Sequence, residues 1–267
     1  MEKEMRPNVW MALILASGLI TLSYKLDGGS LGLLYQPTSL LIVFGGITCG
    51  LIMQFSLGDI RLTLSDISTS RSHGHKTRLV PKQIYTWAKK VRRDGIRVLE
   101  DDLETIKDPV LKRAVYVAVE NGSSASTVEI LSAERQNLSD RLLTAPQVLE
   151  AAGNYAPTMG MIGSILGLIH LMQNLHDPSN MGPGIATAFV STLYGGVLAN
   201  LVIMPLANRL SKYHNEILSQ FDLVSNAMIG ILEQRNPLVI QEAISIRQSK
   251  TVNVLNNQTE SDQDSFE

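Results

Sequence analysis

Residues 153–175 read GNYAPTMGMIGSILGLIHLMQNL, and residues 185–207 read IATAFVSTLYGGVLANLVIMPLA. Each stretch has 23 residues, enough for a helix to cross a bilayer. Both are studded with Gly, Ser, Thr and Pro, and neither contains Asp, Glu, Lys or Arg. Small and hydroxyl-bearing side chains favour close helix packing and are compatible with an ion path. Because neither stretch carries a carboxylate, we expect a partner to supply the titratable group if the chain conducts ions; His170 could relay protons, although a packed histidine is the alternative.

The rest of the chain divides sharply into apolar and charged regions. It has 267 residues, of which 45% are hydrophobic. Two more apolar blocks cover residues 9–24 and 38–57, whereas residues 58–150 are rich in charge. This segregation predicts an all-α integral membrane protein with four transmembrane helices and a large helical cytoplasmic domain between the second and the third. The net charge of −2 and the absence of a basic tail do not indicate binding to nucleic acid.

The distribution of Lys and Arg predicts the orientation. Of the 23 basic residues, 15 fall within 58–150, and Lys25 is the one basic residue in the two short links 25–37 and 176–184. The positive-inside rule therefore places the long insert and both termini in the cytoplasm. The predicted organisation is a cytoplasmic N-terminus (1–8), a transmembrane hairpin (9–57), a cytoplasmic helical domain (58–150), a second transmembrane hairpin (151–210), a cytoplasmic C-terminal helix (211–247) and a disordered tail (248–267).

Local signals predict helices within the insert. Asp108-Pro109 is typical of a helix start, and Asn121-Gly122 of a helix end. A further helix is predicted from about 126 to 141, and its continuation into the third span is left open.

Small residues in the third and fourth spans favour close packing. Three glycines of the third span recur at helical spacing on one face, and the fourth span has a second small-residue face; these residues are Gly160, Gly163, Gly167, Gly195 and Ala199. Pro157 and Pro205 lie near the cytoplasmic ends of their helices, where they could form a shared hinge.

Four hydroxyl side chains in these spans are candidates for the ion path: Ser164, Thr192, Ser191 and Thr158. Each hydroxyl could coordinate a passing ion or water. Each could instead bond back to the carbonyl four residues earlier in its own helix.

Several motifs together carry a family resemblance. They are Ala156-Pro157-x-Met159-Gly160-Met161-Ile162-Gly163, Ser191-Thr192-Leu193-Tyr194-Gly195 with Pro205, Gly28-Gly29-Ser30, Tyr35-Gln36-Pro37 and Asn236-Pro237. In order and spacing the chain resembles the MotA/PomA flagellar stator family from about residue 9 to 245. A looser likeness extends to the TolQ/ExbB energy transducers, which normally have three spans.

The stator resemblance implies an ion-conducting subunit in the bacterial inner membrane. Five copies would surround two copies of a MotB/PomB-type partner, whose single span carries an essential aspartate. H⁺ or Na⁺ flow would then produce torque on the rotor protein FliG. The alternatives are a TolQ/ExbB-like transducer serving another envelope process and a membrane scaffold without transport.

The same resemblance assigns a role to charges in the insert. Lys89-Lys90-Val91-Arg92-Arg93 precedes an acidic group that begins at Glu100. Arg92 and Glu100 match rotor-contacting positions of the family, with Arg93 and Asp101 as secondary candidates. Without the resemblance, these charges would be read as a solvated helical surface.

The resemblance leaves the ion open. Ser164 and Thr192 place hydroxyls where sodium-driven members commonly have threonines, and hard cations prefer oxygen ligands. Gln36, however, occupies a position where the sodium-type pattern often has an aspartate. The sequence shows no nucleophile–base set, metal-ligand cluster or phosphate loop, so neither an enzyme nor a bound cofactor is expected.

Overall fold

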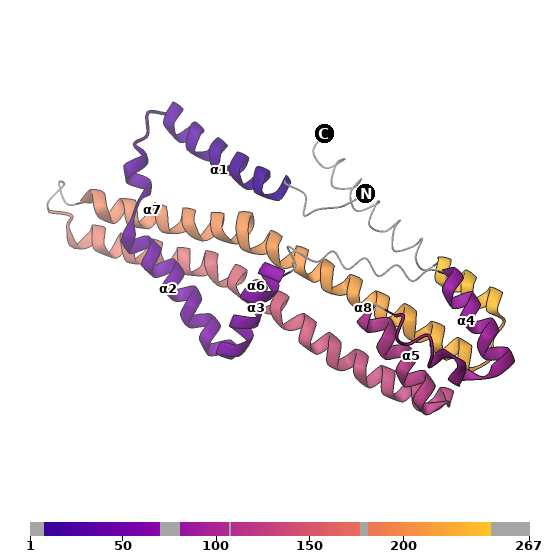
Figure 1. Cartoon of the computed structure of the whole chain (residues 1–267). Helices are drawn as coiled ribbons and strands as arrows, with labels where there is room; N and C mark the ends of the chain where they lie inside the picture. Colours follow the sequence, from indigo (N-terminus) through magenta and orange to yellow (C-terminus); the bar gives the residue numbers. More distant parts are fainter. Residues whose placement is uncertain (1–7, 70–80, 107, 177–180, 247–267) are drawn as a thin grey trace. The chain divides into compact units, whose positions relative to one another are not determined.

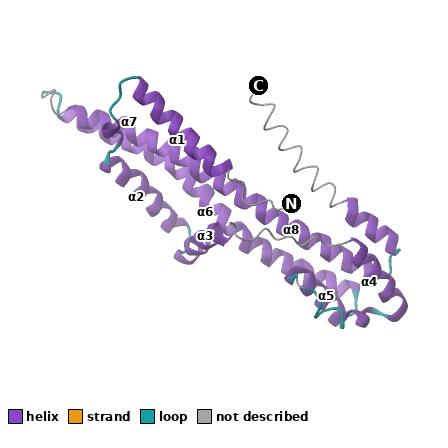
Figure 2. Cartoon of the chain, turned by 45° about the horizontal axis from the view of Figure 1, so that its top comes forward, coloured by secondary structure: helices purple, strands orange, loops and turns teal. Residues whose placement is uncertain are grey.

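The computed structural model describes residues 8–69, 81–106, 108–176 and 181–246 (Figure 1). These residues form helices and loops and no strand, so the predicted all-α fold is confirmed (Figure 2). The predicted N-terminal segment, apart from Asn8, and the predicted tail 248–267 lie outside the described residues. The chain divides into two compact units.

The first unit combines residues 1–74 with 141–214. Its elements are α1 (Asn8–Leu26), η1 (Leu31–Leu34), α2 (Pro37–Gln54), α3 (Leu57–Thr69), the second part of α6 (Ser124–Gln173), α7 (Met181–Val197), the π-helical segment η4 (Leu198–Ile203) and the start of α8 (Met204–Leu232). Its buried apolar side chains come from α2, α6 and η4, and they are Val43, Ile47, Ala152, Ala156 and Ala199.

Three helical segments are long and apolar enough to cross a membrane. They are Leu31–Gln54, Ser124–Gln173 and Met181–Leu232, while Ile14–Leu26 is a shorter apolar helix. They cover the predicted fourth span (185–207) and most of the predicted second (38–57) and third (153–175), but end at Gln54 and Gln173. The first predicted span, 9–24, stays a prediction.

Prolines are accommodated in two ways. Helix α6 continues through Pro146 and Pro157, so the helix predicted from about 126 runs on into the third span, a continuation that the sequence leaves open. Pro205, by contrast, is the second residue after the π-helical segment η4. A proline cannot donate its backbone N–H and its ring presses on the carbonyl four residues earlier, so a widened turn before Pro205 has a clear cause.

The second unit combines residues 75–140 with 215–267. Its described elements are α4 (Pro81–Asp94), η2 (Ile96–Leu99), α5 (Pro109–Asn121), the first part of α6, the second part of α8 and a helix over Pro237–Ile246. Large buried side chains from these elements form one core, among them Ile84, Leu99, Val115, Leu131 and Met228.

The predicted bounds of α5 are confirmed. The Asp108 carboxylate accepts hydrogen bonds from the backbone N–H groups of Val110 (2.7 Å) and Leu111 (3.2 Å), and Pro109 occupies the first turn. Gly122 ends the helix with φ +61°, a left-handed conformation that glycine adopts at little cost.

The C-terminal region differs from the single helix predicted over 211–247. Helix α8 ends at Leu232, and a second helix begins at Pro237. Between them, Gln234 has φ +53°, and the Asn236 side chain accepts a hydrogen bond from the Leu238 N–H at 3.0 Å. A left-handed residue followed by an Asn-Pro helix start breaks the helix in two.

Candidate functional site

Helices α6 and α7 approach each other at glycines. A β-carbon placed on Gly167 would lie 2.5 Å from the Ala188 backbone nitrogen, and one on Gly195 would lie 2.5 Å from the Ala156 carbonyl oxygen. One on Gly160 would lie 2.8 Å from the Ser191 carbonyl oxygen. The predicted small-residue face therefore lies where the two backbones meet, with no room for a side chain.

Other members of that face contact side chains. A β-carbon on Gly163 would lie 2.5 Å from the Ser191 side chain, and Ala199 belongs to the buried cluster of this unit. On the other side of α6, Gly46 of α2 faces the Met159 side chain. Helix α6 thus packs against α7 on one side and α2 on another.

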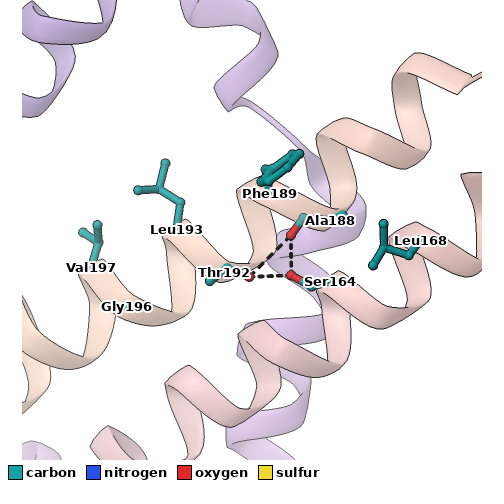
Figure 3. Close-up of a pocket in the computed structure, with 8 residues that line it drawn as sticks. All are labelled: Ser164, Leu168, Ala188, Phe189, Thr192, Leu193, Gly196 and Val197. Carbon is teal, nitrogen blue, oxygen red and sulfur yellow. Dashed lines mark hydrogen bonds between the residues drawn. The ribbon is translucent and has the colours of Figure 1, made fainter.

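Beside the glycine contact, two hydroxyls converge on one carbonyl (Figure 3). The Ser164 Oγ donates to the Ala188 carbonyl oxygen, and the Ser164 and Thr192 hydroxyls are hydrogen-bonded to each other. The Thr192 Oγ1 lies 3.5 Å from the same carbonyl. Two residues predicted for the ion path are therefore brought together on neighbouring helices.

These three residues line an open groove of about 560 Å³. The remaining lining is apolar and uncharged: Leu168, Phe189, Leu193, Gly196 and Val197. Phe189 projects beside it, with 75% of its surface exposed. The groove thus offers hydroxyl and carbonyl oxygens on an otherwise apolar wall, without a charge of its own.

The other two hydroxyls predicted for the path lie elsewhere. Ser191 is fully buried, and its Oγ donates to the Ser39 Oγ of α2 at 2.9 Å. The exposed Thr158 donates to the Tyr155 carbonyl oxygen of its own helix at 2.8 Å. Neither lines the groove, and their part in an ion path stays a prediction.

The sequence reading missed Ser39 and Thr187. The Ser39 Oγ donates to the Thr187 carbonyl oxygen at 3.3 Å, and the Thr187 Oγ1 is 3.3 Å from the Thr38 Oγ1. Both residues lie in uncharged apolar stretches, where a single hydroxyl in the sequence does not indicate a contact between helices. Their importance depends on which helices pack together.

His214, in the first half of α8, is buried, which the sequence did not suggest. Its side chain is 2% exposed, and a hydrogen bond joins it to the backbone of Leu142. Leu142 lies four residues before Pro146, so its carbonyl lacks the usual helical donor, and the buried His214 ring lies beside this part of the backbone. Burial lowers the pKa of His214, with smaller opposing effects from this bond and from Asp66.

The charges predicted to contact a rotor lie in the second unit. Thr86, Lys89, Lys90, Arg92 and Arg93 line a groove of about 410 Å³ along α4. Arg93 pairs with Asp94 at 2.8 Å, and this hydrogen bond lowers the pKa of the Asp94 carboxyl. Lys90 pairs with Asp102 at 3.1 Å.

Arg92, Glu100 and Asp101 are exposed. Within the described parts of the chain they have no ion-pair partner. Their charges are therefore available to another molecule.

The described residues contain no group of three or more His, Cys, Asp and Glu side chains that could hold a metal ion.

Comparisons with known proteins identify the family of this chain. Residues 102–223 match the MotA/TolQ/ExbB proton channel family. The chain is 33% identical to Motility protein A of Aquifex aeolicus over 239 residues, covering 87% of this chain and 93% of the relative. It is 31% identical to the chemotaxis protein PomA of Vibrio alginolyticus, covering 80% of this chain and 84% of PomA.

The fold also matches a solved structure, that of the flagellar MotAB stator complex from Bacillus subtilis. The TM-score is 0.76 at 25% identity, covering 88% of this chain and 92% of that one. With two relatives above 30% identity matched over most of their length, this chain belongs to the MotA/PomA family of flagellar stator proteins.

Proposed function

We propose that this chain forms the channel wall of a flagellar motor stator, in which ion flow past the Ser164–Thr192 groove drives rotation. The observation that carries the proposal is the groove itself, where two hydroxyls and one carbonyl oxygen are set in an uncharged apolar wall. Oxygen atoms in such a setting can replace part of an ion's hydration shell.

A partner supplies the charge that the groove lacks. An ion crossing between α6 and α7 needs a site whose charge can be neutralised, and an aspartate in a partner helix would provide it by taking up H⁺ or Na⁺. A MotB partner is supported by the MotAB complex in the matched structure. By the family resemblance, two partner copies stand inside five copies of this chain.

The membrane arrangement follows from the charge distribution. Four spans, with the first at 9–24, place both termini and the insert in the cytoplasm of a cell whose inner membrane holds the complex. The two short links then face outward.

Coupling to the rotor runs through the prolines and the insert. Pro157 lies next to Ala156, whose carbonyl meets Gly195, and Pro205 follows the π-helical turn. Both are places where a helix can bend. Exposed Arg92 and Glu100, with Arg93 and Asp101, then engage charged residues of FliG through contacts that form and break quickly.

The test removes one hydroxyl from the groove. Thr192→Val keeps the shape of the side chain and removes its oxygen. Thr48→Val is the control: it makes the same change at an exposed site on α2, where the hydroxyl donates to the Phe44 carbonyl oxygen of its own helix. The chain and its partner are expressed in cells lacking their own stator, and motor speed is measured with and without Na⁺ and with a protonophore. Loss of speed in Thr192→Val but not in Thr48→Val supports the proposal, and equal speeds in both would remove Thr192 from the path.

The partner gene separates this function from the TolQ/ExbB-like alternative. A partner with an aspartate in its single span and a peptidoglycan-binding domain supports a stator. A partner with a periplasmic domain of the TonB-interacting kind would instead support an energy transducer.

A further inference from the structure

A chain of polar contacts joins α2 to α7. We call its members, Gln36, Ser39, Thr187, Ser191 and Tyr194, the polar seam. At its inner end, the Ser191 Oγ donates to the Ser39 Oγ at 2.9 Å, and the Ser39 Oγ donates to the Thr187 carbonyl oxygen at 3.3 Å. Both serine side chains are 0% exposed.

The outer end of the polar seam ties the start of α2 to α7. The Gln36 Nε2 donates to the Thr187 Oγ1 at 3.1 Å and lies 3.4 Å from the Pro183 carbonyl oxygen. The Tyr194 hydroxyl donates to the Leu34 carbonyl oxygen, just before α2 begins. The seam therefore fixes α7 to α2 at several points along its length.

The contact with α6 offers α7 fewer side-chain hydrogen bonds than the polar seam does. At Gly160, Gly167 and Gly195 the two backbones touch without interlocking side chains. Between the described residues of α6 and α7, the side-chain hydrogen bonds both belong to Ser164. The Ser191 side chain of the polar seam also packs over Gly163 of α6, so the rotation of α7 about its axis is set by the polar seam together with the two Ser164 hydrogen bonds.

That rotation decides where Thr192 points. Successive residues of an α-helix are turned by about 100° from each other, so Ser191 faces α2 while Thr192 faces the groove. We propose that Ser39 is a positioning residue for the ion path, which by holding Ser191 fixes the place of the Thr192 hydroxyl in the groove. This inference rests on the proposed function.

The structure also predicts that removing the Ser39 hydroxyl leaves the protein folded. In Ser39→Ala the Thr187 carbonyl loses the Ser39 donor and Ser191 loses its acceptor. Thr187 lies four residues before Ser191 on the same helix, so the Ser191 hydroxyl can rotate and donate to the Thr187 carbonyl. No buried hydroxyl is orphaned, yet this tie between α2 and α7 is lost.

The experiment measures motor speed against external Na⁺ concentration and against external pH, with the chain and its partner expressed in cells lacking their own stator. The unaltered chain first shows which ion drives rotation. In Ser39→Ala the half-saturating concentration of that ion should shift by about threefold to twentyfold, the range that one interhelical hydrogen bond supplies in a membrane. Thr48→Ala, which removes an exposed hydroxyl from the same helix, should cause no shift.

A second comparison tests whether the two serines act as a unit. Ser191→Ala should cause the same shift as Ser39→Ala, and the double variant should go no further than either single one. Ser39→Cys, which keeps a weak donor on a somewhat larger side chain, should shift less, and it serves as the test if Ser39→Ala does not assemble.

Three results would overturn the inference: an unchanged half-saturating concentration in Ser39→Ala, an equal shift in Thr48→Ala, or additive shifts in the double variant. Failure of the unaltered chain to rotate the motor would instead refute the proposed function.

Discussion

Replacing Gly167 by Ala tests the close approach of α6 and α7. The added β-carbon would lie 2.5 Å from the Ala188 nitrogen, and ordinary contact begins at 3.4 Å, so α7 must move away by about 0.9 Å. The opposing atoms are backbone, so no side chain can turn aside. Overpacking of this kind costs about 1–3 kcal/mol, and for a chain of this size the melting temperature should fall by roughly 2–12 °C.

The measurement is thermal unfolding of the purified complex of this chain with its partner in detergent. Gly45→Ala is the matched control, because Gly45 is a helical glycine of α2 with nothing within 4 Å of its β-carbon position. The control should melt at or above the temperature of the unaltered complex, since alanine favours a helix over glycine. If Gly167→Ala melted together with Gly45→Ala, the backbone contact described here would be refuted.

Three further changes have expected results that the same unfolding assay can measure. Gln234→Gly should stabilise the protein by about 1 kcal/mol, because Gln234 has φ +53° and glycine adopts that conformation at little cost; no gain would contradict the left-handed turn after α8. Asp108→Ala should destabilise it by about 0.5–2 kcal/mol, because two N–H groups of α5 lose their acceptor, and a neutral result would argue against the cap. Burial lowers the pKa of His214 in the folded protein, so the unaltered protein should lose stability as the pH falls below the ordinary histidine pKa of about 6.5. His214→Gln should reduce this loss of stability between about pH 7.5 and pH 5.5. Equal acid sensitivity of the variant and the unaltered protein would exclude His214 as the source.

Features that depend on neighbouring residues in the chain could be predicted from the sequence. Asp108-Pro109 and Gly122 begin and end α5 as expected, because a capping carboxylate, a proline and a left-handed glycine act within one turn. The apolar stretches could be predicted for a similar reason, since the length needed to cross a bilayer is a property of the stretch itself.

Features that depend on packing between helices could be predicted only in part. Ser164 and Thr192 were expected on one path, and the structure places them at one carbonyl. The neighbouring Ser191 carries the same signal in the sequence, yet it faces Ser39 of α2. Nothing local distinguishes two adjacent hydroxyls until the helices on either side are known.

The end of α8 near Gln234 could not be predicted from the sequence either, because Gly or Asn usually occupies the left-handed position after a helix. The π-helical segment had only Pro205 to suggest it.

The π-helical segment η4 also changes the helical phase of the chain. Before it, buried residues recur every three or four positions, at Gly184, Ala188, Ser191 and Gly195. After it they recur in the same way, at Ala207, Leu210 and His214, but eight positions separate Ala199 from Ala207. A π-helical turn accommodates one residue more than an α-helical turn, so it shifts the sequence that follows by about 100° around the helix axis. Deleting one residue within 198–203 would restore the α-helical phase and turn His214 away from the carbonyl that Pro146 leaves without a donor.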